Sequence, residues 1–291
     1  MTTQFEIFKH FNVSRRDTLV KTKTHQYYSD VVTSAIYDRG WIAISGPIGS
    51  GKTETAYDVL DTWRNRRDTR VIDVFSPDRA GIKISHVMNS IIYQLGQEFI
   101  ASTSPRRDME ARAMQCLNVL SSARKGGVNV VIVVDEAHEL HGNTLKAIKR
   151  LREHRFRGER NLATFIMIGQ PGLSAKLSRD EEVGLRCDAF DFQYTMAELR
   201  EIAKHHSYKM LSDDDCTTLA HKYETPLAIV HGIFNAMRTA YQLDDDQLRI
   251  SHFDLPDDNK EKTVTGTRQK IQVDPSAAGK IESKYTQKEA S

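Results

Sequence analysis

The stretch Gly46-Pro47-Ile48-Gly49-Ser50-Gly51-Lys52-Thr53 decides the fold of this chain, because it fits the pattern G-x-x-x-x-G-K-[ST] of a phosphate-binding loop (P-loop). Its glycines let the backbone curl so that successive N–H groups point at phosphate oxygens. The lysine can reach the β- and γ-phosphates, and the threonine hydroxyl can ligate Mg²⁺. Together with the following Glu54, this stretch predicts a site for ATP and Mg²⁺.

The residues on either side of the loop support this reading. Residues 41–45 are typical of a short buried strand, and residues 53–64 of a helix whose N-terminus faces the bound anion. A helix that begins where phosphate binds adds its unpaired N–H groups to the site.

A second chemical signal lies at Asp135-Glu136, which follow the hydrophobic run Val130 to Val134. In this Walker B arrangement Asp135 would hold Mg²⁺, directly or through water, and Glu136 would polarise the attacking water. An acidic pair after a strand is a weak signal alone, but together with a P-loop it predicts ATP hydrolysis. Asp135-Glu136-Ala137-His138 also spells the name of the DEAH helicases, which need two recombinase-like domains that 291 residues with one P-loop cannot supply.

Strand and helix patterns alternate through the first two thirds of the chain. Residues 41–45, 70–75, 128–134, 162–168 and 189–194 are expected strands, separated by helical patterns that include 82–100 and 143–157. This predicts an α/β fold, a P-loop NTPase with a doubly wound parallel five-stranded sheet. Only helices are expected after that, at about 195–211, 213–223 and 226–242, so a small C-terminal helical lid domain is predicted.

The domain boundaries follow from these patterns. Residues 1–23 form an N-terminal extension that packs on its own domain or on a neighbouring subunit; residues 24–194 form the nucleotide-binding domain and 195–255 the lid. Residues 256–291 are polar and without periodicity, so a disordered tail is expected there.

Composition narrows the class of protein. The net charge of +2 shows no global basic excess, so any nucleic-acid surface must be local. Three widely spaced cysteines provide no disulfide framework or C-x-x-C metal pair. No apolar run approaches the ~20 residues of a membrane span, so a cytoplasmic protein with no membrane partner is expected.

Three further positions are candidates for catalysis. Gln170 follows the predicted strand 162–168 and would lie near the γ-phosphate, the position called sensor 1, although Gly169 and Pro171 also fit a plain turn. Arg186, and Arg179 as second choice, lie where an arginine of a ring- or filament-forming ATPase can reach the neighbour's γ-phosphate. Either could instead be a solvated surface charge.

Two local cation clusters are candidates for contacting DNA phosphates. One lies in the helical pattern 143–157 and the other precedes the third helix. A solvated helix face with ion pairs is the alternative reading. The candidate residues are Lys146, Lys149, Arg150, Arg152, Arg106 and Arg107.

These motifs together resemble the AAA+ ATPases, and more narrowly the transposition regulators that include the Mu phage B protein, TniB and TnsC. The resemblance covers about residues 25–242. Glu54-Thr55-Ala56 after the P-loop, Val133 to His138 with Leu140 after them, and Pro105-Arg106-Arg107 match the group's patterns. The stretch Ile168 to Pro171 is most similar to the related ExeA-type secretion ATPases.

The resemblance implies a function. ATP-bound subunits would assemble on double-stranded DNA as a ring or helical filament, each ATP lying between Lys52, Thr53, Asp135 and Glu136 of one subunit and an arginine of the next. The assembly would mark a target and recruit a transposase, possibly with a target-selection protein, and ATP hydrolysis would drive disassembly. The alternative is an ExeA-like secretion-accessory or signalling ATPase that does not bind DNA; Glu136 and the helical lid disfavour a small-molecule kinase.

One departure from the family pattern affects the expected rate. Family members usually carry a sensor 2 arginine where this chain has Leu227 and Ala228, and Arg238 lies about three turns further along. Slow, partner-stimulated hydrolysis is therefore expected.

Overall fold

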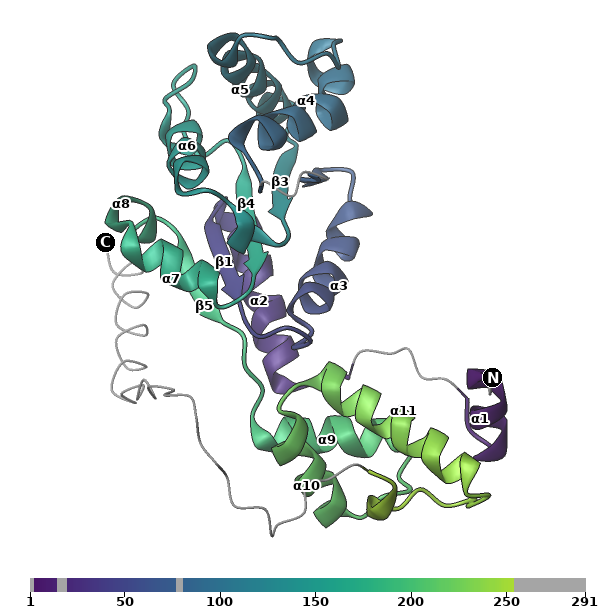
Figure 1. The fold of residues 1–291 in the computed structure, drawn as a ribbon. Helices are drawn as coiled ribbons and strands as arrows, with labels where there is room; N and C mark the ends of the chain where they lie inside the picture. The colour runs from purple at the N-terminus through teal and green to yellow at the C-terminus, as the bar shows by residue number, and fades with distance from the viewer. Residues whose placement is uncertain (1–2, 15–19, 77–80, 254–291) are drawn as a thin grey trace, which may run out of the picture. The chain divides into compact units, whose positions relative to one another are not determined.

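A central parallel sheet organises the computed structural model, which describes residues 3–14, 20–76 and 81–253. The strands are β1 (Trp41–Ser45), β2 (Thr69–Asp73), β3 (Asn129–Val134), β4 (Thr164–Gly169) and β5 (Asp188–Asp191). Their order is β2-β3-β4-β1-β5, with every pairing parallel, for example Trp41 opposite Phe165 and Val131 opposite Thr164 (Figure 1). The predicted five-stranded parallel sheet is confirmed.

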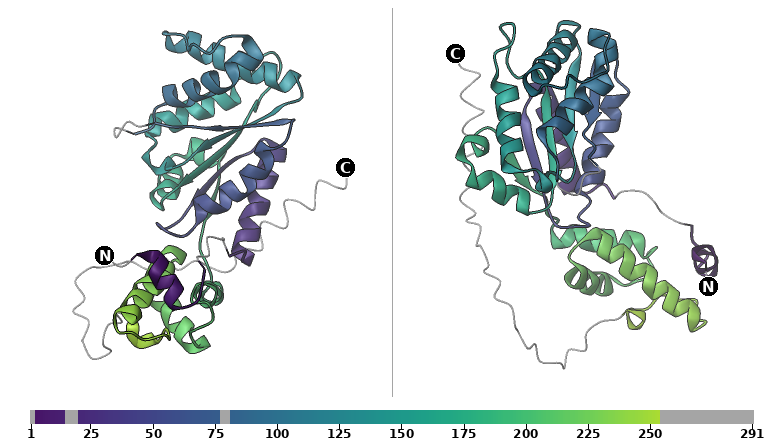
Figure 2. Two further views of the ribbon diagram at one scale, coloured as in Figure 1. Left: turned by 90° about the vertical axis from the view of Figure 1, so that its right-hand side faces the viewer. Right: turned by 45° about the horizontal axis from the view of Figure 1, so that its top comes forward.

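The sheet is buried on both faces because its strands are runs of β-branched and other apolar residues. On one face, residues such as Ile132 and Phe165 pack against α4 (Ile84–Ile100), α5 (Met109–Lys125), α6 (Gly142–Glu153) and α7 (Gly172–Arg179). On the other face, Ile42, Ile44 and Val131 pack against α2 (Lys23–Asp38) and α3 (Lys52–Arg64). Figure 2 shows helices on both sides of the sheet. These are the layers of a doubly wound fold.

Helix α6 is shorter than its pattern predicts. The helix ends at Glu153 instead of 157, and the chain then turns back through an isolated bridge between Phe156 and Glu159. Gly158 has φ +88°, a left-handed conformation that glycine adopts without a Cβ penalty. The chain leaves the helix at His154, whose ψ is 122°, and the turn at Gly158 follows.

The segment after β5 is helical, as expected. It comprises α9 (Met196–His206), α10 (Asp213–Tyr223), α11 (Pro226–Gln242) and the short η2 (Ile250–His252). Thr195, Ser212 and Thr225 cap the three α-helices, each accepting a hydrogen bond from a backbone N–H of the first turn. The predicted tail, 256–291, lies outside the described residues.

A short helix that the sequence patterns did not predict, α1 (Gln4–His10), lies on α11 of the same chain. Its Phe8 ring lies 6.1 Å from that of Phe234, and Ile7 is fully buried. Of the two packing partners expected for the N-terminal extension, the structure shows the one within the chain.

No helix in the described part of the chain is both long and apolar enough to cross a membrane.

Candidate functional site

The P-loop connects β1 to α3 in a conformation that depends on glycine. Gly49 and Gly51 have φ +78° and +83°, and Gly51 is the N-cap of α3. At Gly49 the space is also closed, because a Cβ there would lie 2.8 Å from the Cβ of Leu227. A side chain at this position would clash as well as strain the backbone. The loop leaves the first N–H groups of α3 without intrahelical partners.

Two polar side chains of this loop make few or no hydrogen bonds to the rest of the described chain. Lys52 is only 8% exposed, yet its one described contact is a hydrogen bond from Nζ to the Pro47 carbonyl at 3.3 Å. The hydroxyl of Ser50 is buried and has no hydrogen-bond partner among residues 3–14, 20–76 and 81–253. Buried polar groups without partners are costly, so a ligand that supplies acceptors here is favoured.

Asp135 and Glu136, which follow β3, lie at the same edge of the sheet as the P-loop. Thr53 Oγ1 lies 3.5 Å from Asp135 Oδ1, so the two proposed Mg²⁺ ligands meet although 82 residues separate them. The backbone N–H of Glu136 donates to the same Asp135 oxygen at 2.8 Å. This bond leaves the other carboxylate oxygen of Asp135 available to a cation.

Glu136 stands in a special backbone conformation. Its φ is +50°, which is left-handed, and its side chain is 58% exposed. Its Oε2 lies 3.1 Å from Nδ1 of His138, close but without hydrogen-bond geometry. Lys176, from α7, donates to the carbonyls of His138 and Leu140 and holds this turn. The sequence patterns gave no sign of this anchoring lysine.

Gln170 is placed by the strand order. It directly follows β4, which lies between β3 and β1. Its carbonyl accepts from Leu173 N–H at 2.9 Å, and no polar contact of its side chain occurs among the described residues. The side chain is therefore free to serve as sensor 1, although the turn into α7 would exist without that role.

The first turn of α11 contacts the P-loop at the sensor 2 position. Leu227 N–H donates to the Gly49 carbonyl at 3.1 Å, and its side chain packs on Gly49. The position where the sequence resemblance would place a sensor 2 arginine thus provides an apolar contact to the loop backbone and no charge for a phosphate.

Two buried tyrosines near the site were not predicted. Tyr57 donates to Asp73 Oδ1 at 2.9 Å, and burial raises its pKa far above the usual value. Tyr194 lies beside Gly51, and burial raises its pKa to about 12. Both phenols therefore stay neutral at physiological pH and act as hydrogen-bonding groups.

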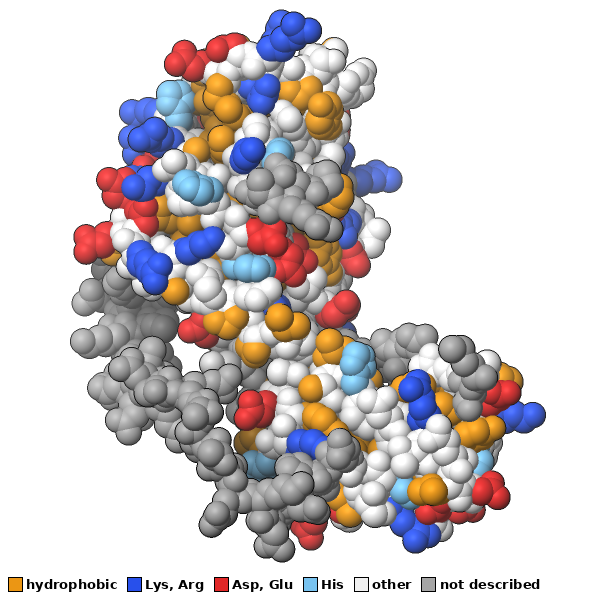
Figure 3. All heavy atoms as spheres, in the orientation of Figure 1, with side chains coloured by type: hydrophobic (Ala, Val, Ile, Leu, Met, Phe, Trp, Pro, Cys, Tyr) orange, Lys and Arg blue, Asp and Glu red, His pale blue; other side chains and the backbone are white. Residues whose placement is uncertain are grey.

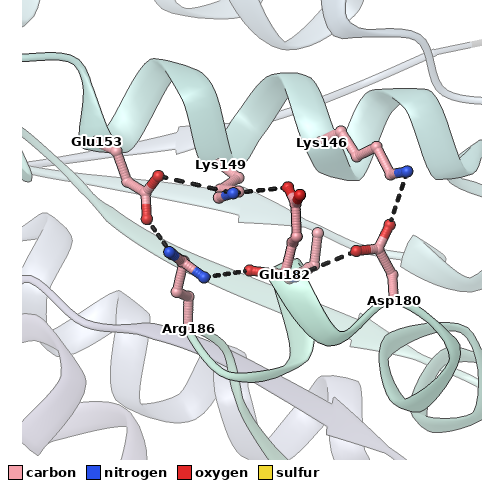
Figure 4. A network of polar contacts seen from close by, with 7 residues as sticks. Lys146, Lys149, Glu153, Asp180, Glu182 and Arg186 are labelled. Atoms are coloured by element: carbon pink, nitrogen blue, oxygen red, sulfur yellow. Dashed lines mark hydrogen bonds and ion pairs between the residues drawn. The ribbon is translucent and has the colours of Figure 1, made fainter.

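The two candidate arginines differ in their surroundings. Arg186 donates from Nε to Glu153 and from Nη1 to the Glu182 carbonyl, at 2.8 Å for the latter (Figure 4). Arg179, at the end of α7, is exposed and has no polar partner in the described part of the chain. Arg186, the first choice for an arginine that acts on a neighbour, is thus held within its own chain, whereas Arg179 is not engaged by any described residue.

Helix α6 uses much of its positive charge internally. Lys149 is 14% exposed and pairs with Glu182 at 2.7 Å, and Lys146 lies 3.4 Å from Asp180 (Figure 4). The acids come from α8 (Glu181–Gly184) and the residue before it, about 30 positions later in the chain. Figure 3 shows blue and red side chains interspersed along this edge.

Arg152, one of the candidates for contacting DNA phosphates, has most of its side chain inside the fold. Arg152 is only 9% exposed; its Nη2 donates to the Arg39 carbonyl at 2.7 Å, and its guanidinium lies 5.6 Å from the centre of the Trp41 ring. Burial lowers its pKa. The ammonium of Lys149 is also engaged within the chain, by Glu182. Arg106, Arg107 and Arg150 are exposed, and Lys146 is exposed although paired.

The residues present fit ATP and Mg²⁺. The buried Ser50 hydroxyl lacks a partner, Lys52 has a single weak contact, and Thr53 and Asp135 together form an oxygen pair of the kind that Mg²⁺ prefers. Among the described residues no group of three or more His, Cys, Asp or Glu side chains is placed to hold a metal alone. A cation at Asp135 would thus share its shell with water and phosphate.

Comparison with known proteins agrees with this geometry. Residues 35–177 match the sequence model of a family described as an AAA domain. No curated protein matches the sequence significantly. Cdc6p from Pyrobaculum aerophilum is similar in structure with a TM-score of 0.57 and 15% identity, over 83% of this chain and 68% of that one.

Two other solved structures are similar in the same way. ORC2 from Aeropyrum pernix, in ADPNP–ADP complexes, gives a TM-score of 0.54 at 12% identity, over 84% of this chain and 69% of that one. A RuvB mutant from Thermotoga maritima gives 0.50 at 15% identity, over 80% and 68%. Such low identities show the fold alone. With the AAA-domain match at residues 35–177, they show that this chain has the P-loop AAA+ fold.

Proposed function

We propose that this chain is a Mg²⁺-dependent ATPase that binds duplex DNA and regulates DNA transposition in the cytoplasm. The observation that carries the ATPase is the meeting of Thr53 and Asp135 at 3.5 Å, beside a lysine and a serine that the fold leaves largely unused. Bound Mg²⁺ would neutralise phosphate charge during transfer. The DNA and transposition parts rest on exposed cations and on the motif resemblance.

Each residue of the site has a distinct role in this proposal. Lys52 and the loop N–H groups hold the phosphates, and Thr53 and Asp135 hold the cation. Glu136, whose carboxylate is open to solvent, orients and polarises a water molecule. Gln170 contacts the terminal phosphate from the end of β4. Because Leu227 supplies no charge, hydrolysis by the isolated chain is slow.

A second copy of the chain would complete the site. Arg179 is the better candidate for an arginine that acts on the neighbour's nucleotide, because it is exposed and unpaired among the described residues. Mixing two inactive variants tests this. R179A retains a complete P-loop, and K52A retains Arg179, so the mixture should recover part of the ATPase activity that each lacks alone. No recovery, together with full activity of R179A alone, would show that Arg179 has no such role.

DNA contact is proposed for the cations that the fold leaves exposed. These are Arg106 and Arg107 before α5, Arg150 on α6, and Lys146, whose surface pair with Asp180 is weak enough to exchange. Non-specific duplex binding needs phosphate neutralisation and no base readout. A DNA-bound assembly would mark the target and recruit a transposase, alone or with a target-selection protein, and hydrolysis would release it.

Filter binding with duplex DNA tests the proposal. With a non-hydrolysable ATP analogue, the affinity should fall as salt rises, and the double variant R106Q/R107Q should lower the log–log salt slope by about two. R66Q is the matched control, because Arg66 is already paired with Asp68 at 3.1 Å. An ATPase that does not shift duplex DNA at low salt would favour the ExeA-like alternative.

A further inference from the structure

A pocket of about 360 Å³ opens at the amino ends of β1, β4 and β5, the edge of the sheet opposite the P-loop. Gly40 and Trp41 at the start of β1, Asn161 before β4 and Asp188 at the start of β5 form its base. Helix α6 forms one wall. None of the groups already assigned to ATP or Mg²⁺ lines this pocket.

Two buried donors in the pocket wall lack acceptors. The Nε–H of Arg152 and the indole N–H of Trp41 have no hydrogen-bond partner among the described residues, although Trp41 is only 2% exposed. Among the described residues, the Arg152 guanidinium donates one hydrogen bond, to the backbone carbonyl of Arg39, and none to a carboxylate. An unmatched buried donor costs more than a made hydrogen bond gains, so the pair favours an acceptor that enters from the pocket.

The charge of the pocket favours an anion. Five cationic side chains line it, but Lys149 is paired with Glu182 and Arg186 with Glu153, which leaves Arg39, Arg152 and Arg160 against Asp38 and Asp188. Glu153 is already engaged by Arg186 and lies 3.9 Å from Lys149 (Figure 4). The one hydrogen bond that the Arg39 side chain donates within the described part of the chain goes to the neutral amide of Asn129, at 3.0 Å. Arg160 is exposed, and its side chain has no polar partner in the described part of the chain.

We infer that this pocket is a second anion site, which binds one phosphate group through Arg152, Arg160 and Arg39. A guanidinium group can donate two parallel N–H hydrogen bonds to the oxygens of a phosphate. Three guanidinium groups around one open pocket can therefore bind an oxyanion. The phosphate comes either from free inorganic phosphate or from the backbone of duplex DNA. The inference stands independently of the proposed ATPase.

Calorimetric titration of the full chain with inorganic phosphate tests the site. The protein is first saturated with Mg²⁺ and a non-hydrolysable ATP analogue, so that the P-loop does not take up phosphate. Saturable binding is expected, and R160Q should weaken it by about tenfold, the usual effect of losing one charge-assisted hydrogen bond. R155Q is the matched control: the Arg155 side chain, just after α6, is exposed and does not line this pocket, so the affinity should change less than about twofold.

A second variant and a second ligand complete the design. R152M should abolish phosphate binding, and its circular dichroism shows whether it folds; R160Q decides the matter if it does not. If R160Q also weakens binding of duplex DNA, the phosphate is that of DNA, and if only inorganic phosphate is affected, the ligand is the free anion. Absence of saturable binding, or equal losses in R160Q and R155Q, would mean that the pocket holds water only and would overturn the inference.

Discussion

The P-loop and helix α6 are both rich in positive potential, but the fold treats them in opposite ways. At the P-loop, Lys52 makes one contact with a carbonyl, and the Ser50 hydroxyl makes none. On α6, Lys149 is matched by Glu182, and Arg152 is buried against Trp41. The polar groups of the P-loop are therefore available to a ligand, whereas Lys149 and Arg152 of α6 are engaged in contacts within the chain.

This difference shows that a local excess of cations is poor evidence for a binding surface. Neighbours in sequence tell which charges lie together, but only the tertiary structure tells which are already neutralised. Lys146 and Lys149 look unpaired in the sequence because their acidic partners, Asp180 and Glu182, lie about 30 residues away. Replacing equivalent residues in the two regions should therefore give different kinds of defect.

The largest expected effect is that of K52A on ATP hydrolysis. Removing the only cation in the loop should lower the rate by about 10³-fold or more, equivalent to about 4 kcal/mol of transition-state stabilisation. The melting temperature without nucleotide should hardly change, because Lys52 has only the Pro47 contact. K149A is the matched lysine control, with hydrolysis within about twofold of the wild type. Equal losses in both variants would contradict the comparison.

The reverse pattern is expected for Arg152. R152A removes a buried side chain and leaves the Arg39 carbonyl without its donor, so urea unfolding should show a loss of about 2–4 kcal/mol. ATP affinity of the folded fraction should stay the same. R150A, two positions earlier and exposed, should change the free energy of unfolding by less than about 0.5 kcal/mol. A stable R152A would mean that Arg152 is not part of the fold.

Most of the sheet and the nucleotide site could be predicted because their signals are local. The run from Val130 to Val134 can only be a buried strand, and the P-loop is one contiguous motif that sets its own backbone. The order of the strands then brings Asp135 to Thr53 without any further information. Strand periodicity and motif spacing carry this part of the structure.

The rest depends on contacts that no local pattern records. Helix α6 ends at Glu153 and the chain turns at Gly158, although the helical pattern of cations in the sequence continues to residue 157. The burial of Arg152 depends on Trp41, more than 100 residues earlier, and the packing of Leu227 on Gly49 joins positions even further apart. Such pairings decide which arginines are available, so the roles of Arg186 and Arg152 could not be read from the sequence.

Glu198 is a buried acidic residue whose negative charge is stabilised by hydrogen bonds within the chain. Glu198 on α9 accepts from the backbone N–H groups of Thr24 and Thr195, at 2.7 and 2.9 Å, and from both hydroxyls. Burial by itself would raise its pKa, but these hydrogen bonds outweigh burial and lower the pKa to about 2. Because the folded pKa lies below the ordinary value of 4.5, its stabilising effect is complete above about pH 4.5 and is lost as the pH falls towards 2.

E198Q should therefore lose about 1–3 kcal/mol of stability near neutral pH, since an amide cannot accept as many charge-assisted bonds. Melting curves of wild type and E198Q should converge as the pH is lowered from about 5 to about 3. E201Q, an exposed neighbour on the same helix, should follow the wild type at every pH. A difference between wild type and E198Q that stays constant across this range would rule out the carboxylate as the cause.

The smallest effect is expected for the surface pair of Arg186 and Glu153, whose side chains are both about two-fifths exposed. A double-mutant cycle with R186A and E153A should give a coupling free energy of about 0.2–1 kcal/mol, because water and salt screen exposed ion pairs. The coupling should shrink in about 0.5 M salt. ATP hydrolysis separates this pair from a trans-acting arginine: R186A should stay within about threefold of wild type, whereas R179A should lose at least about tenfold. If R186A lowered ATP hydrolysis more than R179A, Arg186 would have to leave Glu153 in the assembled state. Arg186 would then be the arginine that acts on the neighbour's nucleotide.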